Sequence, residues 1–418
     1  MDGVVEFPAE RNRTDSGGLR VESVETFDGL LALKSEWQRL ERLDPENSVF
    51  LSWDWLAQAF RPTVGRWRVL AVYHNARLVC VLPLKYRVHW STTTEAFQSE
   101  IEAGGRLLWS EYTGFLCNPD SEAEAIPALS RSLRGLPWSR LSLRYVGSEA
   151  RSALFMEGFS QAEYSKQWEE YRINKGTVDN LSCPQIALPS DFDTYLNEGP
   201  SKNTRQKIRR FTRKYIDSSE LTFSAATDAT IKQDLGVLLR FWMLKWSKTK
   251  GPDGARLVAS NYLRMLSTAH RLGLLYLPVL RRGDRPIAAL GHILDPKMKR
   301  VHFIAAGRDE TEQGAYIGLL MHSQSIRWAI EQGYGTYDFC HGDEPYKFSF
   351  GSQATKLNSI LIRRRELPRG GRSLDPLNHR EALARVLEFV ETGKSKRAAR
   401  GCRQLLSLTR PAVPPDRG

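Results

Sequence analysis

The order of apolar and polar positions is most informative between residues 301 and 351. Residues 301–306 are apolar, with β-branched and aromatic side chains, and predict a buried strand. Residues 315–332 carry apolar side chains at helical spacing and end at Gly333, a typical C-cap. Residues 337–339 predict a second short strand that leads into a polar loop. Together they form one α/β crossover, and sites in such sheets lie beyond the carboxyl ends of the strands.

A weak internal repeat indicates how the rest of the chain is organised. Residues 67–86 and 275–294 both predict two apolar strands joined by a tight turn. Residues 142–149 and 337–344 each combine a short strand with a glycine-containing loop. The repeat predicts two similar α/β (α+β) domains with mixed central sheets flanked by helices. The competing interpretation is that any two hairpins look alike.

Composition and element order divide the chain into four predicted segments. Residues 1–18 are polar and predict a disordered leader. Residues 19–180 form the predicted N-terminal domain and residues 181–365 the C-terminal domain. A strand predicted at residues 356–363 closes the second domain. Residues 366–418 predict a helical, basic tail.

The composition excludes several classes of protein. A hydrophobic content of 41% and a charged content of 26% fit a soluble globular protein. No apolar run approaches the roughly 18 residues that a membrane span needs. The N-terminus has no apolar segment typical of a signal peptide, so we expect a cytoplasmic protein; peripheral contact with a membrane stays open. The five cysteines are scattered without a CxxC pair, which predicts a reducing compartment, no disulfide framework and no metal site.

Part of the formal charge of +12 is concentrated in one predicted helix at residues 201–215. Seven cations and no acid lie between Ser201 and Lys214, namely Lys202, Arg205, Lys207, Arg209, Arg210, Arg213 and Lys214. Such a face would bind phosphate groups of tRNA, coenzyme A or a nucleotide-sugar-like acceptor. We take Arg205 and Arg209 as candidate substrate-binding residues. A face that is merely solvated is the alternative.

Five motifs between residues 201 and 351 carry a family resemblance. They are SKNTRQKIRRF (201–211), RFWMLKW (240–246), RPIAALGHI (285–293), AYIGLLM (315–321) and DFCHGDEPYKFSFG (338–351), and the N-terminal stretches SVFLSWDWLAQAF (48–60) and LVCVLPLKYR (78–87) add to it. Together they resemble the CelD-like acetyltransferases of the GNAT superfamily, which are linked to bacterial cellulose or exopolysaccharide biosynthesis. The resemblance covers residues 21–364. This family is similar in turn to the Fem-type transferases, which have two tandem GNAT-like domains and take an aminoacyl group from tRNA.

The resemblance implies a tandem GNAT-like fold and acyl transfer, with acetyl-CoA as the expected acyl-CoA co-substrate. Such transfer needs backbone N–H groups at the carbonyl and a helix N-terminus at the phosphates of the donor. The candidate cofactor-binding residues are Phe303, Ile304, Ala305, Gln313, Gly314, Ala315, Tyr316 and Gly318. The usual GNAT loop, Gln/Arg-x-x-Gly-x-Gly/Ala, is incomplete because Gly314 and Gly318 are four residues apart. Aminoacyl-tRNA therefore stays open as the donor, and glycines that only shape the loop are the alternative.

The polar loop after the second strand supplies the candidate catalytic residues. The resemblance to Fem-type proteins implies that Lys347 steadies the developing oxyanion; a lysine on a solvated edge is the alternative. The candidate general bases are Asp338, His341, Asp343 and Glu344. Cys340 as a nucleophile would require a covalent acyl-enzyme, which direct transfer does not need.

Two aromatic residues complete the candidate site. Tyr346 precedes Lys347 and is a candidate for binding the substrate. Trp246 lies one helical turn after Trp242 and would form an aromatic wall against a sugar or acyl chain. Core packing of the two tryptophans is the alternative.

Three functions follow from these observations. The first is a GNAT-type N- or O-acyltransferase that acts on an amino sugar, an amino-acid derivative or an envelope polysaccharide precursor. The second is a Fem-type transferase dependent on aminoacyl-tRNA. The third is a catalytically silent adaptor of a polysaccharide synthase. The absence of long heptad helices of the Fem type disfavours the second function.

Overall fold

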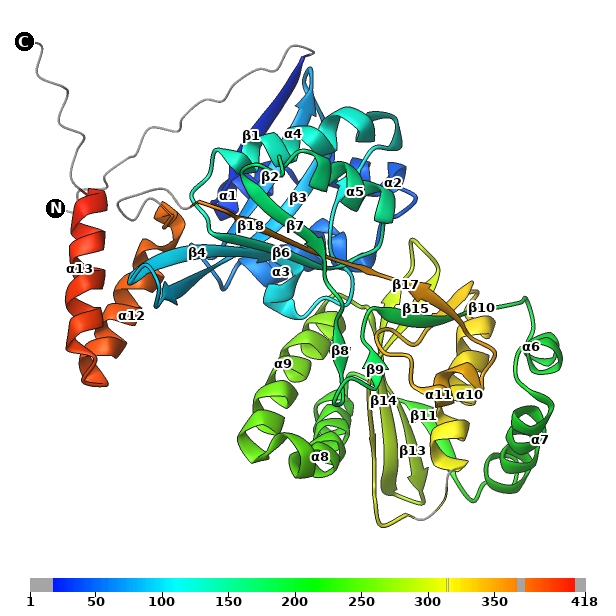
Figure 1. The fold of residues 1–418 in the computed structure, drawn as a ribbon. Helices are drawn as coiled ribbons and strands as arrows, with labels where there is room; N and C mark the ends of the chain where they lie inside the picture. Colours follow the sequence, from blue (N-terminus) through cyan, green and yellow to red (C-terminus); the bar gives the residue numbers. More distant parts are fainter. Residues whose placement is uncertain (1–17, 313, 315, 367–372, 410–418) are drawn as a thin grey trace, which may run out of the picture. The chain divides into compact units, whose positions relative to one another are not determined.

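The computed structural model describes residues 18–312, 314, 316–366 and 373–409 (Figure 1). The chain divides into two compact units, one made of Met1–Glu169 with Asn358–Gly418 and the other of Glu170–Leu357. The chain therefore leaves the first unit once and returns to it. Most of the predicted leader, residues 1–17, lies outside the described residues. Among the described helices, none combines the length and the hydropathy that crossing a bilayer requires.

The first unit is built on a mixed sheet. In spatial order its strands are β1 (Leu19–Val24), β2 (Trp67–His74), β3 (Arg77–Ser91), β4 (Ala96–Ala103), β6 (Arg140–Val146), β18 (Asn358–Arg364) and β7 (Tyr164–Trp168), with β5 (Leu116–Cys117) beside β3. Strands β4 and β6 are parallel, whereas the other neighbours are antiparallel.

Helices cover the sheet of the first unit. They are α1 (Phe27–Ala32), α2 (Lys34–Leu43), α3 (Trp53–Phe60), α4 (Glu122–Arg134), α5 (Glu149–Glu157), α12 (His379–Glu391) and α13 (Ser395–Thr409), with the 3-10 turns η1 (Val49–Leu51), η2 (Gly104–Leu108), η3 (Pro119–Ser121) and η5 (Pro376–Asn378). Helix α4 shows why they pack there: Ile126, Leu129 and Leu133 follow the helical period and are buried in the core.

The described part of the predicted tail packs on the first unit. Helices α12 and α13 form a small apolar cluster with Trp90 of β3 and Phe97 of β4. Beside it the buried guanidinium of Arg68 donates to both carboxylate oxygens of Asp375, at 2.9 and 3.2 Å. Main-chain pairing also places β18 between β6 and β7. The single strand predicted at residues 356–363 thus corresponds to two strands, Gln353–Lys356 and Asn358–Arg364. The longer of the two lies in the first unit.

The second unit holds the other mixed sheet. Its strands in spatial order are β11 (Thr222–Ala225), β13 (Pro278–Arg282), β14 (Arg285–Asp295), β15 (Arg300–Arg308), β16 (Thr336–Asp338), β10 (Ser182–Ala187) and β17 (Gln353–Lys356), with β12 (Leu275–Tyr276) beside β14. Strands β15 and β16 are parallel, and the remaining pairs are antiparallel. A separate small sheet pairs β8 (Arg172–Ile173) with β9 (Val178–Asp179).

Helices flank this sheet on two sides (Figure 1). They are α6 (Phe192–Glu198), α7 (Lys202–Phe211) with its π-helical extension η4 (Thr212–Ile216), α8 (Ile231–Lys250), α9 (Pro252–Arg271), α10 (Tyr316–Glu331) and α11 (Pro345–Phe348). Helices α6, α7 and α10 share one apolar core with the strands. Helix α8 comes close to β15 at Gly307, where a Cβ would lie 2.5 Å from the carbonyl oxygen of Leu238.

The two units repeat one chain order, which supports the internal repeat. A hairpin, a strand, a helix and a parallel strand follow each other as β2–β3–β4–α4–β6 in the first unit and as β13–β14–β15–α10–β16 in the second. In each sheet the parallel strand has, on its other side, a strand from a distant part of the sequence. This strand is β18 beside β6 in the first unit and β10 beside β16 in the second. The predicted fold class, two mixed sheets flanked by helices, is confirmed.

Candidate functional site

The parallel strands of the second unit part after three residue pairs. Arg300 to His302 pair with Thr336 to Asp338, and the ladder between β15 and β16 ends there. The chain after β16 then follows β10, because the N–H of Phe339 donates to the carbonyl oxygen of Pro184 at 2.9 Å. In the described part of the chain, residues 303–308 of β15 therefore pair in a ladder only with β14.

The predicted residues Phe303, Ile304 and Ala305 lie where the strands part. Gly291 of β14 pairs with Ala305, and the next residue, His292, pairs with Phe303. Ile304 has no opposite residue on β14 and is the extra residue of a β-bulge. A bulge re-aims the backbone of its strand. The edge of β15 that faces away from β14 thus offers main-chain groups to a bound molecule, as acyl transfer requires.

Helix α10 begins soon after β15 ends. Gly314 has a φ of 142°, and a Cβ there would lie 2.1 Å from the ring of Tyr316, so only glycine fits. Gly318 lies in the first turn, is exposed, and has open space where a Cβ would stand. The first turn of such a helix has unpaired N–H groups and a positive dipole end. Gln313 and Ala315, the other predicted residues of this turn, lie outside the described residues.

The basic helix lies beside the start of α10. The ring of Tyr215 stacks on that of Tyr316 with centroids 4.4 Å apart, and Phe211 lies 5.6 Å from Tyr316. The ammonium of Lys214 lies 4.8 Å from the centroid of Tyr215. Lys214 of η4 therefore lies next to the aromatic pair that contacts the start of α10.

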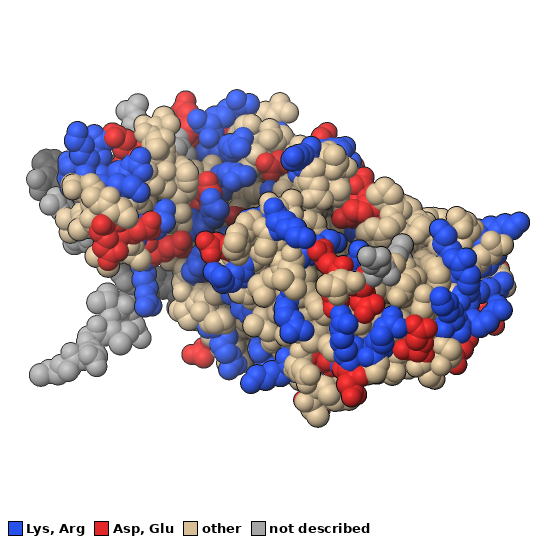
Figure 2. Space-filling model, turned by 90° about the horizontal axis from the view of Figure 1, so that it is seen from below, with Lys and Arg blue, Asp and Glu red and all other residues tan. Residues whose placement is uncertain are grey.

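Lysine and arginine side chains gather over α7, at the right of the view in Figure 2. Arg205 donates to the carbonyl oxygen of Asn197 at 2.6 Å, and Arg209 to its side-chain oxygen at 3.0 Å. These two predicted residues thus hold α7 against α6, with the rest of their surfaces open to an anion. Among the described residues, no carboxylate forms a salt bridge with any of the seven cations of this helix.

Asp338, at the end of β16, is buried in a cluster of polar side chains. Its Oδ2 lies 3.0 Å from Nδ1 of His302, and its Oδ1 accepts from the N–H of Cys340 at 2.8 Å. The amide of Gln185 lies 3.4 Å from the same Oδ2. The Sγ of Cys340 lies 4.0 Å from Nδ1 of His302. Asp338 is thus engaged on both oxygens.

Lys347 is buried and holds its own loop. Its ammonium donates to the carbonyl oxygens of His341 and Gly342 at 2.6 and 2.9 Å, and lies 3.0 Å from a carboxylate oxygen of Glu344. Two of the three N–H bonds of the ammonium thus donate to carbonyl oxygens, whereas the contact with Glu344 is an ion pair without hydrogen-bond geometry. Asp343, another predicted base, accepts from the N–H of Asp179 at 2.8 Å.

A second polar network lies on the opposite face of β16. The hydroxyl of Tyr337 is 2.9 Å from Nε2 of His292 and 3.0 Å from Nδ1 of His322. Nδ1 of His292 lies 3.3 Å from the carbonyl oxygen of Tyr276. Burial lowers the pKa of His292 to about 3 and that of His322 well below its ordinary value. Burial also raises the pKa of Tyr337, so the network is uncharged at neutral pH.

The two predicted aromatic residues lie in different places. Tyr346 is partly exposed, and its ring is 5.9 Å from that of His322, so it borders the network just described. Trp246 lies on α8 and packs near Trp242, with centroids 6.0 Å apart. Helices α8 and α10 flank the sheet on opposite sides (Figure 1). Trp246 therefore belongs to a separate apolar cluster.

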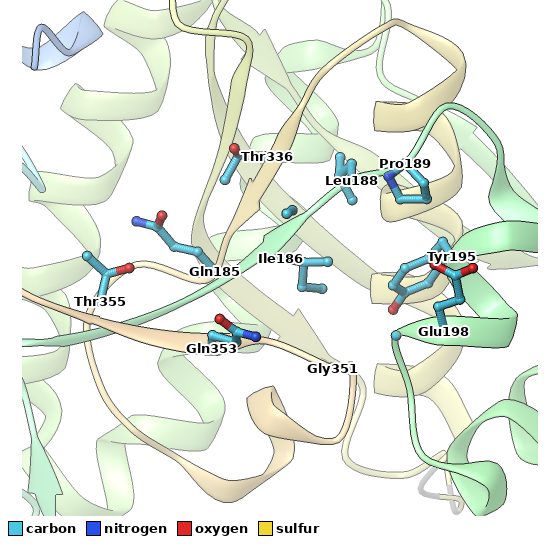
Figure 3. Close-up of a pocket in the computed structure, with 12 residues that line it drawn as sticks. Gln185, Ile186, Leu188, Pro189, Tyr195, Glu198, Thr336, Gly351, Gln353 and Thr355 are labelled. Atoms are coloured by element: carbon cyan, nitrogen blue, oxygen red, sulfur yellow. The ribbon is translucent and has the colours of Figure 1, made fainter. Parts of the chain in front are cut away.

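A cavity of about 570 Å³ opens along β10 and β17. Figure 3 shows Gln185, Thr336 and Thr355 on one side of β10, and Tyr195 with Glu198 of α6 on the other. Gln185 lines this cavity and also contacts Asp338. Gln185 thus stands between the cavity and the buried polar cluster, whose other side chains are not part of the cavity wall.

The structure brings together part of the predicted site. His302 of β15 contacts Asp338 and Cys340 directly, whereas the start of α10 contacts the basic helix, and all of these residues belong to the second unit. The sequence did not point to His292, His302 or His322, because each is isolated in an apolar stretch. Their spacing to Asp338 and Tyr337 becomes visible only once the strands are paired.

The comparisons with known proteins agree with this geometry. A family model described as an acetyltransferase (GNAT) domain matches residues 202–348, which include α7, β15, α10 and β16. No curated protein matches the chain.

The solved structure of FemX shares the fold. FemX matches with 11% identity and a TM-score of 0.54, over 81% of this chain and 96% of that one. A tandem GNAT protein from the clavulanic acid biosynthesis pathway matches with 9% identity and a TM-score of 0.47, over 84% and 100%. The C-terminal domain of a putative lysylphosphatidylglycerol synthetase from Agrobacterium fabrum matches with 10% identity and a TM-score of 0.45, over 81% and 93%. The last two scores are too low to establish a shared fold, and the FemX match establishes the fold alone.

Proposed function

We propose that this chain is a GNAT-type acyltransferase. It transfers an acyl group, acetyl in the expected case, from acyl-CoA to an amine or hydroxyl of a small molecule or envelope polysaccharide precursor. The proposal includes a CelD-like role in polysaccharide biosynthesis, which rests on the sequence resemblance. The supporting observation is the arrangement in the second unit, where β15 and β16 part and α10 begins beside a basic helix.

The residues of the second unit fit an acyl-CoA. The main chain at Phe303 to Ala305 would donate to the thioester carbonyl, and the first turn of α10 up to Gly318 would bind the phosphates. Cations of α7 would add attraction for the same phosphates. The thioester itself supplies an activated acyl group, so the protein needs mainly to position the acceptor and remove a proton.

The catalytic roles follow from the contacts of the loop. Lys347 positions residues 341–344 through their carbonyl oxygens, and an ammonium released from one contact would stabilise an oxyanion. The proposed bases are His341, which belongs to this loop, and Asp338, which precedes it. Asp343 holds the loop to Asp179 by accepting from its N–H. Tyr346, whose ring lies 5.9 Å from that of His322, is proposed on the acceptor side, and Arg205 and Arg209 are proposed among the cations that attract phosphate. Trp246 packs in the separate cluster on α8 and is given no role at this site.

A second candidate function is Fem-type transfer from aminoacyl-tRNA. It is favoured by the fold shared with FemX and by the seven cations of α7 and its extension η4, which suit a longer polyanion than coenzyme A. A non-catalytic adaptor would keep the fold without needing an open helix terminus at Gly318.

One matched pair of variants tests the donor site. In Gly318→Glu the carboxylate would stand in open space in the first turn of α10, where negative charge favours the helix. The same charge would repel the phosphates of acetyl-CoA by about 1–2 kcal/mol, which weakens binding about tenfold. Gly318→Ala adds the Cβ without the charge and should bind as the wild type does.

Binding of acetyl-CoA and of charged tRNA should be measured by calorimetry on the full chain. Acetyl-CoA is expected to bind, and only Gly318→Glu is expected to weaken it. Equal affinity of the wild type and Gly318→Glu would overturn the placement of the phosphates. Binding of charged tRNA without binding of acetyl-CoA would favour the second function. Incubation with isotopically labelled acetyl-CoA and a bacterial metabolite extract would then identify the acceptor.

A further inference from the structure

Three metal-ligating side chains converge at the end of β16. His302 and Asp338 are partners in the parallel ladder, so their side chains leave the sheet on the same face. Cys340 follows two residues later. Nδ1 of His302, a carboxylate oxygen of Asp338 and Sγ of Cys340 all lie within 4.8 Å of one another, and all three side chains are buried.

The arrangement does not match a nucleophile with its base. In a cysteine–histidine–aspartate relay the two ring nitrogens of the histidine face different partners, one the nucleophile and the other the carboxylate. Here Asp338 and Cys340 both lie against Nδ1, at 3.0 and 4.0 Å. A proton cannot pass through the ring between two groups that share one nitrogen. The three donor atoms instead surround a single point.

We propose that His302, Asp338 and Cys340 bind one zinc ion. Tetrahedral zinc with its usual bonds to nitrogen, oxygen and sulfur separates the donor atoms by about 3.3–3.6 Å. The observed separations of 3.0 and 4.0 Å lie on either side of that range, so small side-chain rotations would complete the geometry. The proposal does not require acyl transfer, but a zinc-bound Asp338 would leave His341 as the proposed base of that reaction.

The donor set selects the metal. Imidazole and thiolate ligands favour zinc over magnesium or calcium, which prefer oxygen alone. On binding, the thiol of Cys340 releases its proton to solvent. The doubly charged ion, one thiolate and one carboxylate then sum to zero, which suits a buried site.

Contacts around the donors hold them in place. Asp338 uses its other oxygen to accept from the N–H of Cys340 at 2.8 Å. That bond fixes the carboxylate while its Oδ2 stays directed at His302. Cys340 has a φ of 52°, the left-handed conformation that turns its side chain back toward β15.

Gln185 gives the site a fourth donor and a route to solvent. Its amide lies 3.4 Å from Oδ2 of Asp338, and a half-turn of the amide would direct its oxygen to the ion. The same residue lines the cavity in Figure 3, through which an ion would enter. Bound there, zinc would tie β16 to β15 at the last pair before the strands part.

The experiment uses the full chain, stripped with a chelator under reducing conditions and titrated with Zn²⁺ alone against a chromophoric competitor. We expect one ion per chain and a raised melting temperature. Cys340→Ser and His302→Ala should each weaken binding at least tenfold, because loss of even an outer contact weakens metal sites by about 10–100-fold. Cys402→Ser removes an exposed thiol far from the cluster in sequence and should change nothing.

Cobalt gives a readout that does not depend on folding stability. Co²⁺ in the wild type should show a thiolate-to-metal charge-transfer band that is absent from Cys340→Ser, a near-isosteric change whose fold is checked by circular dichroism. The proposal is overturned if the wild type binds no more Zn²⁺ than Cys340→Ser does. It is also overturned if the cobalt complex lacks the thiolate band, or if the band disappears in Cys402→Ser.

Discussion

Replacing Lys347 with methionine tests whether this lysine acts mainly on its loop. The substitution keeps an unbranched side chain, one atom shorter, and removes the ammonium, which donates at 2.6 and 2.9 Å to the carbonyl oxygens of His341 and Gly342. A hydrogen bond from a charged donor contributes about 1.5–3 kcal/mol. The contact with Glu344 adds little, because that carboxylate is a third exposed. Lys347→Met should therefore lower the free energy of unfolding by about 3–5 kcal/mol.

The matched control is Lys356→Met, since Lys356 is an exposed lysine on β17. It should change stability by no more than about 0.5 kcal/mol. Urea unfolding at pH 7, followed by circular dichroism, measures both variants, and hydrogen exchange reports on residues 341–347. If Lys347→Met unfolds at the same urea concentration as the control, the reasoning from the hydrogen bonds is refuted. Loss of turnover in such a stable variant would then assign Lys347 to the oxyanion.

Two further predictions concern the second unit, one about the protonation of His292 and one about the packing at Gly307. His292 has a pKa of about 3 when folded and about 6.5 when unfolded, so only the unfolded chain gains its proton as the pH falls. This residue should lower the free energy of unfolding by about 2 kcal/mol between pH 7 and pH 5. In His292→Gln that contribution should be absent, so its free energy of unfolding should fall less over the same pH range. Curves of unfolding free energy against pH that run parallel for the two proteins, measured by urea unfolding, would contradict this prediction. Gly307→Ala should lower stability by about 1–3 kcal/mol, because its Cβ would press on the backbone of α8. Gly236→Ala on the same helix meets open space and should raise stability by about 0.5–1 kcal/mol, so equal melting temperatures would count against the packing argument.

The crossover around α10 could be predicted from sequence because its signals are local. The apolar run at residues 301–306 became β15, and the helical pattern at 315–332 became α10, with bounds that differ by one residue at each end. Each element is specified by its own periodicity and by nearby glycines. The same locality explains why the repeated hairpins pointed correctly to two similar sheets.

The domain boundaries and the histidines could not be predicted in this way. Strand β18 has an apolar pattern that fits either sheet, and only its pairing with β6 and β7 assigns it to the first unit. His302 is 36 positions before Asp338 in the sequence, and the parallel ladder places them side by side. A scattered set of cysteines and histidines therefore does not exclude a metal site, although it gives no local pattern to find one.

The alternation of side chains along β16 explains how one short strand supports two polar clusters. Tyr337 points to the face with His292 and His322, whereas Asp338 points to the face with His302. Buried polar groups are tolerated only where they are hydrogen-bonded, so the Asp338 cluster fixes β16 against β15, and the Tyr337 cluster fixes it against β14 and α10. A side-chain contact thus joins β15 and β16 at the last pair of their ladder, and beyond that pair β15 has a ladder only with β14 among the described strands. A substitution in either cluster should loosen this point, whereas a change in the first turn of α10 should affect only what binds there.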